Sequence, residues 1–122
     1  MKVSHMRIFT LDARTEARTF AERFRSEVGP VYSQYGFELE GGWITTSLPV
    51  GLTRGAGKDG SIPWVAGPQN RYIYIVSYEG PESWQAKVEE FYSSPEYAAV
   101  SPDLQARIVD RAFMFVERTL PR

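Results

Sequence analysis

The segment Asn70–Gly80 reads N-R-Y-I-Y-I-V-S-Y-E-G and decides the fold of the chain. Its tyrosines alternate with aliphatic residues, which is the two-residue period of a β-strand. One strand face carries Tyr72, Tyr74, Val76 and Tyr78, and the other carries Ile73, Ile75 and Ser77. Both faces are too apolar for either one to remain in water. We therefore expect helices of the chain to cover one face, and a ligand or a second subunit to cover the other.

The composition is that of an ordinary globular domain. The 122 residues are 43% hydrophobic and 24% charged, which suits one domain with its own core. A net charge of −1 and a pI of about 5.8 argue against a phosphate-binding surface, so we expect no nucleic-acid partner. No apolar run reaches the roughly 18–20 residues of a membrane span, and the N-terminus lacks the apolar core of a signal peptide. We expect a cytoplasmic protein with no membrane partner.

The periodicity along the chain predicts four strands and two main helical regions. The predicted strands are Val3–Leu11, Phe37–Ser47, Arg71–Tyr78 and Arg111–Leu120. The predicted helices are a long amphipathic one over residues 17–35, one that starts near Pro81, and short ones over Glu96–Val100 and Asp103–Asp110. Pro30 should kink or restart the long helix, and Gly36 suits a left-handed C-cap. The pair Gly41–Gly42 predicts a bulge or a close backbone approach in the second strand.

This β-α-β-β-α-β order is the ferredoxin-like unit, an α+β fold with an antiparallel sheet and both helices on one face. We expect one domain over residues 1–122, with an extended loop at about 48–69. We place Phe9, Tyr72, Tyr74 and Tyr78 on the open face. Each aromatic side chain buries roughly 150–250 Å², so four of them exceed the apolar patch of roughly 300–600 Å² that monomers leave exposed. Two sheets packed face to face would cover it, so we expect a homodimer.

Several stretches resemble the NIPSNAP family of the dimeric α+β barrel superfamily. V-S-H-M-R-I-F-T-L is similar to the first strand of that family, and G-G-W-I-T-T to its second-strand segment. I-V-S-Y-E-G and S-S-P-E-Y-A-A-V resemble its third strand and the short turn after its second helix. The resemblance covers most of the chain except about residues 48–69. Cofactor-free quinol monooxygenases and small polyketide cyclases are neighbouring families in the same superfamily.

The resemblance implies the fold, a dimer and a pocket, and it implies no particular reaction. The chain departs from the family in two places. Many relatives carry a histidine on the third strand at about the position of Tyr74, and their loop before that strand is shorter. Both departures fall near the expected pocket.

His5 is the only histidine of the chain and the candidate acid–base group. It shares a strand face with Arg7 and Phe9, so a base would stand beside a cation that can hold an enolate or phenolate. The alternative is a partly exposed histidine near a chain end. One histidine without any cysteine makes haem and zinc sites unexpected, although carboxylates alone can bind magnesium. We expect no bound cofactor and no metal centre.

The phenols Tyr72, Tyr74 and Tyr78 form a ladder on one strand face. They can line a pocket for an aromatic ligand, or they can form an interface core with hydroxyls bonded across the barrel. Trp43, near the end of the second strand, can wall the same pocket. In the loop over Pro49–Gln69, Trp64 is the natural anchor of a lid, and the alternative there is a disordered insertion.

These residues support two functional hypotheses. The first is a cofactor-independent enzyme acting on a small apolar or aromatic substrate, phenolic or polyketide-like, by proton transfer, cyclisation, isomerisation or oxygenation. Its predicted catalytic residues are His5, Arg7, Tyr74 and Tyr78, and its predicted substrate-binding residues are Phe9, Trp43, Trp64 and Tyr72. The second is a non-catalytic dimeric module that binds a ligand or a protein. The pocket lies either between sheet and helices or inside the dimer barrel, because alternation defines two faces without labelling them.

Overall fold

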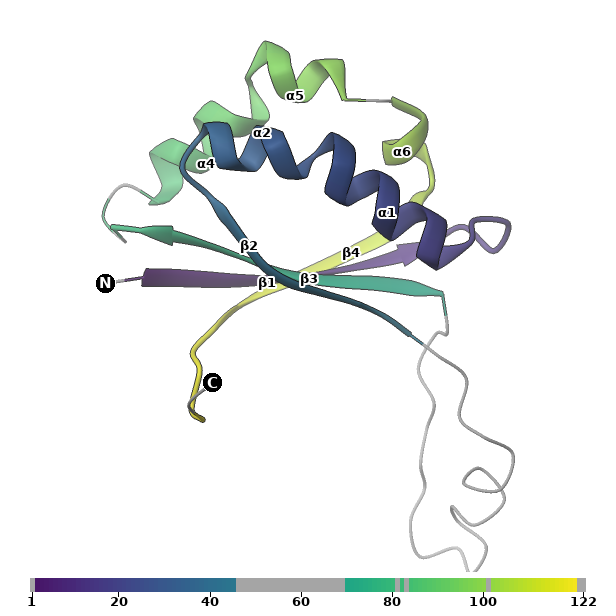
Figure 1. The fold of residues 1–122 in the computed structure, drawn as a ribbon, viewed down its shortest axis with the longest axis horizontal. Coiled ribbons are helices and arrows are strands. Elements are labelled where there is room, and N and C mark those ends of the chain that lie inside the picture. Colours follow the sequence, from purple (N-terminus) through teal and green to yellow (C-terminus); the bar gives the residue numbers. More distant parts are fainter. Residues whose placement is uncertain (1, 46–69, 81, 83, 101, 121–122) are drawn as a thin grey trace, which may run out of the picture.

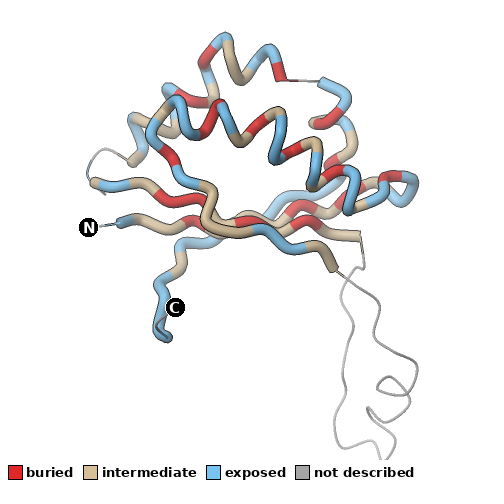
Figure 2. The backbone as a smooth tube through the Cα atoms, viewed as in Figure 1, coloured by how far each residue is buried: buried red, intermediate tan, exposed pale blue. Residues whose placement is uncertain are grey.

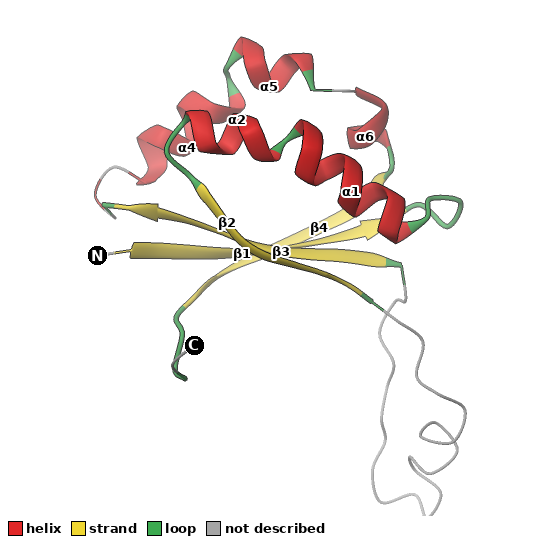
Figure 3. Cartoon of the chain, in the orientation of Figure 1, coloured by secondary structure: helices red, strands yellow, loops and turns green. Residues whose placement is uncertain are grey.

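The computed structural model describes residues 2–45, 70–80, 82, 84–100 and 102–120. Its elements are, in chain order, β1 (Lys2–Leu11), α1 (Ala17–Glu27), α2 (Gly29–Gln34), β2 (Glu38–Ile44), β3 (Arg71–Glu79), α4 (Trp84–Tyr92), α5 (Pro95–Ala99), α6 (Pro102–Ala106) and β4 (Ile108–Val116) (Figures 1 and 3). The strands form one antiparallel sheet in the order β2-β3-β1-β4. The described helices all lie on one side of it (Figure 1). The predicted ferredoxin-like α+β fold is therefore confirmed.

The first helical region is interrupted where the sequence predicts it. α1 ends at Glu27 and α2 begins at Gly29, directly before Pro30, whose ring nitrogen cannot donate a backbone hydrogen bond. The end of α2 is set by Gly36, whose φ of 85° lies in the left-handed region that favours glycine. The amide of Gly36 donates to the carbonyl of Ser33, and so the chain turns at once into β2.

The glycine pair of β2 lies beside the predicted bulge. The register of β2 on β3 shifts between Leu39 and Gly41, which leaves Glu40 as the extra residue. Neither Gly41 nor Gly42 has a positive φ, so the two glycines provide space and not an unusual backbone conformation. A Cβ atom on Gly42 would lie 2.9 Å from the hydroxyl of Tyr72.

The last strand begins earlier and ends earlier than the sequence suggests. The predicted helix over Asp103–Asp110 stops at Ala106, and the strand starts at Ile108 instead of Arg111. Ile108 pairs with Leu11, so antiparallel pairing with β1 prevails over the helical pattern there. The predicted end at Leu120 is also wrong, because β4 ends at Val116.

The core lies between the sheet and the helices (Figure 2). Phe9, Tyr72 and Tyr74 are 4%, 5% and 0% exposed, and Tyr78 packs against the same cluster. Our prediction that these four aromatics project from the open face is therefore wrong. They lie on the helix-covered face, where large rings fill the space between two layers.

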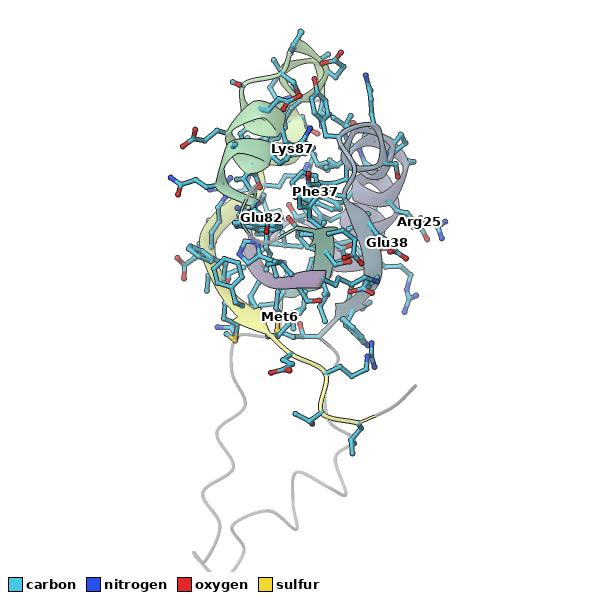
Figure 4. The ribbon with its side chains drawn as sticks, turned by 90° about the vertical axis from the view of Figure 1, so that its left-hand side faces the viewer. Met6, Arg25, Phe37, Glu38, Glu82 and Lys87 are labelled. Carbon is cyan, nitrogen blue, oxygen red and sulfur yellow. The ribbon has the colours of Figure 1, made fainter. Side chains whose placement is uncertain are left out.

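The open face carries the aliphatic half of the pattern. Met6 pairs with Ile75 on one side and with Met114 on the other, so all three share this face. Figure 4 shows Met6 on the side of the sheet away from the helices and Phe37 between the two layers. Trp43, which pairs with Ile73, and Met114 are 52% and 46% exposed. No described helix covers this face.

Candidate functional site

His5 is a buried histidine among aromatic rings. It is 8% exposed, its ring stacks on Phe115 at 5.1 Å, and the edges of Trp84 and Phe113 meet it at 5.3 and 5.0 Å. Among the described residues nothing hydrogen-bonds its Nε2 atom. Burial, with a smaller contribution from the charge of Arg7, lowers the pKa of His5 to about 4. The imidazole is therefore neutral at neutral pH, and His5 is not the exposed residue of the alternative prediction.

The space beside His5 is small in this conformation. A cavity of about 10 Å³ lies among His5, Tyr32, Trp84 and Phe91, which is room for about one water molecule. His5 is shielded on the β4 side by Phe113 and Phe115, which are themselves 63% and 59% exposed. Exposed side chains change rotamer within nanoseconds, so these two rings can turn aside and open the imidazole to solvent.

A cation and two phenols follow His5 along the covered face of β1. Arg7 donates from Nη1 to the hydroxyl of Tyr74 at 3.4 Å, and this hydroxyl shares a 3.0 Å hydrogen bond with Tyr32. The guanidinium also lies 5.1 Å over the ring of Tyr92. No carboxylate among the described residues pairs with Arg7. Burial raises the pKa of both phenols, so Tyr32 and Tyr74 stay protonated as O–H donors.

A second set of polar groups, which the sequence analysis missed, lies beside His5, Arg7 and Tyr74 on the side of α5 and α6. Arg111 donates from Nη2 to Gln105 at 3.1 Å, and Gln105 donates to the hydroxyl of Tyr97 at 3.0 Å. Arg111 also lies 5.8 Å over the ring of Phe9. Phe9 and Arg111 are direct partners in the register of β1 with β4. That pairing is the signal that could have placed Arg111 beside Arg7, and it needs the register, which the sequence does not provide.

The remaining predicted residues lie apart from the group formed by His5, Arg7 and Tyr74. Tyr72 packs toward α1, with its ring 5.2 Å from that of Phe24, and Tyr78 packs 5.2 Å from Phe37. Trp43 is on the other face of the sheet. Trp64 and its loop lie outside the described residues, so the lid stays a prediction. The structure thus brings Arg7, Tyr74 and Phe9 together, places His5 next along β1, and separates Trp43 from them.

Two general features bear on partners. Within the described ranges, no group of three or more histidine and acidic side chains is arranged to hold a metal ion. None of the described helices combines the length and the apolar character that a membrane crossing requires.

Comparison with solved structures places this fold among NIPSNAP proteins. An uncharacterized NIPSNAP domain protein from Burkholderia xenovorans superimposes with a TM-score of 0.69, over 98% of this chain and 99% of that one, at 17% identity. A NIPSNAP family protein from Agrobacterium tumefaciens gives 0.67, over 98% and 94%, at 13% identity. A protein from Arabidopsis thaliana gives 0.54, over 98% of both chains, at 12% identity.

No family model and no curated protein matches the sequence of the chain. At identities below 20% the likeness establishes the fold and nothing about activity. The resemblance in short motifs is thus confirmed at the level of the fold: the chain adopts the NIPSNAP fold, a ferredoxin-like α+β domain.

Proposed function

We propose that the protein is a cofactor-independent enzyme that transfers a proton on a small polyketide-like substrate between the sheet and the helices. The observation that carries the proposal is a neutral, buried His5 with an unpartnered Nε2, two residues along the same strand face from Arg7, which has no carboxylate partner among the described residues. A buried polar atom without a partner is costly in a folded protein and calls for an explanation. A bound substrate would provide that partner.

The step requires only side chains of this chain. His5 Nε2 takes a proton from a carbon between two carbonyl groups, and the electrons of the C–H bond move onto a carbonyl oxygen. The guanidinium of Arg7 and the hydroxyl of Tyr74 donate hydrogen bonds to the resulting enolate oxygen. His5 then returns the proton to an enolate oxygen, which gives the enol tautomer of the substrate. The product is an isomer of the substrate, and the imidazole is neutral again.

The low pKa of His5 narrows the class of substrate. A base with a pKa of about 4 is weak, so it can deprotonate only a carbon acid that is already activated. A 1,3-dicarbonyl compound meets this condition because its enolate charge is shared by two oxygens. Repeated 1,3-dicarbonyl units are the chemistry of polyketides, and their aromatic products suit a site walled by Tyr92, Phe113 and Phe115.

Exchange of the substrate α-proton tests this proposal. Incubation of the full chain with a panel of 1,3-dicarbonyl compounds in D₂O, followed by NMR, should show catalysed exchange, and His5→Gln should slow it roughly 10²–10⁴-fold. Arg14→Gln, a change in an exposed loop, is the control and should leave exchange unchanged. The kcat/KM of the wild type should rise with pH around 4 and be flat from 6 to 8. Equal exchange in His5→Gln and wild type would refute the role of His5.

The open sheet face favours a homodimer as the working form. A hollow of about 990 Å³ on this face is lined by apolar residues such as Met6 and Ile75 and by charges of both signs, among them Lys2 and Glu117. A surface with both signs of charge can be self-complementary across a two-fold axis. A dimer that forms through this face without any exchange activity would favour the second hypothesis, a non-catalytic binding module.

Sedimentation velocity tests the dimer. Met114→Glu places a charge at the centre of the open face and should give a monomer. Val109→Glu is the matched control, because Val109 is 64% exposed on the same strand, lies at the register shift next to Asp110, and does not line the hollow of the open face. A wild-type chain that sediments as a monomer at high micromolar concentration would contradict this proposal.

A further inference from the structure

A pocket lies at the opposite edge of the sheet from His5 and Arg7. It occupies about 460 Å³ beside the edge strand β2, and its polar and aromatic lining includes Arg18, Glu22 and Arg25 from α1, Trp43 from β2 and Tyr72 from β3. This volume falls within the roughly 300–1,000 Å³ of small-molecule sites. In the sheet order β2-β3-β1-β4, β2 and β4 are the two edge strands, so the pocket lies apart from His5 and Arg7 on β1 and from Arg111 on β4. The pocket is therefore distinct from the proposed proton-transfer site, and it shares only Trp43 with the hollow of the open face.

The glycines of β2 keep one polar group accessible from this pocket. Tyr72 is 5% exposed, and its hydroxyl has no hydrogen bond to any described residue. A side chain at position 42 would strike this hydroxyl, because even a Cβ atom there would lie 2.9 Å away. Since Gly42 has no positive φ, its backbone does not require glycine. The absence of a side chain therefore matters for the space over the Tyr72 hydroxyl.

The charges around the hydroxyl favour an anion. Arg18, Glu22 and Arg25 follow one another at the spacing of one helix face, and none of them forms an ion pair with a described residue. The lining thus has two cations against one carboxylate. Burial raises the pKa of Tyr72 to about 12, so its hydroxyl remains a donor at physiological pH. The indole of Trp43, which is 52% exposed, also lines the pocket.

We propose that this pocket binds a flat aromatic carboxylate. The ring system lies against the indole of Trp43, and the carboxylate accepts hydrogen bonds from the hydroxyl of Tyr72 and the guanidinium of Arg25. Stacking on an exposed tryptophan and a charge-assisted hydrogen bond are contacts that such a ligand makes together and that a simple inorganic anion does not.

Titration of the full chain with 2-naphthoate by calorimetry tests the proposal, with the neutral 2-naphthamide as comparator of the same shape. We expect the acid to bind roughly tenfold more tightly than the amide, and its affinity to fall with added salt. Arg25→Gln and Tyr72→Phe should each weaken 2-naphthoate roughly tenfold. Glu22→Gln removes the only opposing charge of the described lining and should strengthen binding. Arg14→Gln, away from the pocket, should change nothing.

A loss of binding in a variant must be distinguished from a loss of folding. Arg25 lies on the outer surface of α1, so Arg25→Gln should keep the thermal midpoint of the wild type, and its affinity can be read without a correction for folding (Figure 4). Equal binding of 2-naphthoate and 2-naphthamide, or unchanged affinity in both Arg25→Gln and Tyr72→Phe, would overturn the proposal. No detectable binding of 2-naphthoate at millimolar concentration would overturn it as well.

Discussion

The two faces of the sheet are both apolar, yet they are built from different side chains. The covered face carries aromatic rings, and its hydroxyls find partners in the interior, as in the pair formed by Tyr32 and Tyr74. The open face carries unbranched and branched aliphatic chains such as Met6 and Ile75. Large rings span the distance between the sheet and the helices. Shorter aliphatic chains project less far from the sheet, which suits the close approach of a second sheet. The two faces thus differ mainly in the type of apolar residue and not in their apolarity, with Trp43 on the open face and Val76 on the covered face as exceptions.

The largest expected effect comes from removing a ring on the covered side. Phe91 is 1% exposed and stacks on Tyr32 at 4.3 Å, so Phe91→Ala should lower the free energy of unfolding by roughly 3–5 kcal/mol. Phe113 is 63% exposed, so Phe113→Ala is the matched control and should cost less than about 1 kcal/mol. Urea denaturation followed by circular dichroism measures both. Similar losses would show that β4 is covered in solution.

A smaller effect concerns the pH dependence of stability at His5. Its pKa is lowered from 6.5 to about 4, so between these values the unfolded chain binds a proton that the folded chain does not. The contribution of His5 to the free energy of unfolding should therefore be complete above pH 6.5. As the pH drops toward 4, this contribution should lower the free energy of unfolding by about 2–3 kcal/mol. Carboxylates also titrate in this range, so the measure is the difference from His5→Phe. Parallel curves for the two proteins would contradict the prediction.

Neighbouring residues of β3 provide a direct test of the two faces. Val76, on the covered face, is 2% exposed, and Val76→Ala should cost roughly 2 kcal/mol at every protein concentration. Ile75 is on the open face, so the cost of Ile75→Ala should grow with protein concentration as dimer forms. Thermal melts over a hundredfold range of concentration distinguish the two. A concentration-independent loss in Ile75→Ala would argue that this face stays unpaired.

The smallest effect belongs to the buried hydroxyls. Tyr74 has two hydrogen-bond partners, Arg7 and Tyr32, whereas the hydroxyl of Tyr32 has only Tyr74 among the described residues. Tyr74→Phe should therefore cost about 1–2 kcal/mol and Tyr32→Phe about 1 kcal/mol. The double variant should cost less than the sum, because one change has already removed the shared hydrogen bond. Strict additivity in chemical denaturation would show that the two hydroxyls act independently.

Much of the fold could be predicted from hydrophobic periodicity and from the positions of glycine and proline. The tyrosine alternation of β3, the restart at Pro30 and the bulge next to Gly41 depend on local geometry that the sequence encodes directly. The start of β4 could not be predicted in this way, because Ile108 is fixed by its distant partner Leu11. Assignment of the faces failed for the same reason: alternation is local, and the layer that covers a face is a property of the whole chain.

The candidate site was predictable only along a single strand. His5, Arg7 and Phe9 share a face of β1 by alternation alone, and the structure keeps them together. Arg111 and Tyr97 join them across strand register and helix packing, so no spacing in the sequence indicates them. For Gly42, as for Gly41, the sequence predicts a bulge or a close backbone approach. The relation of Gly42 to the Tyr72 hydroxyl needed the β2–β3 register.

The bulge at Glu40 limits how this sheet can grow. Lys2 reaches Glu40 at 3.3 Å and Glu38 at 3.5 Å, so the β2 edge is kinked and charged and makes a poor template for another strand. The β4 edge is regular from its pairing of Asp110 with Thr10 to its pairing of Val116 with Ser4. Head-to-tail addition of β4 to β2, which would extend into a fibril, is therefore disfavoured. Pairing of β4 with β4 would leave a kinked β2 edge at each end of the joined sheet, so strand addition would stop there.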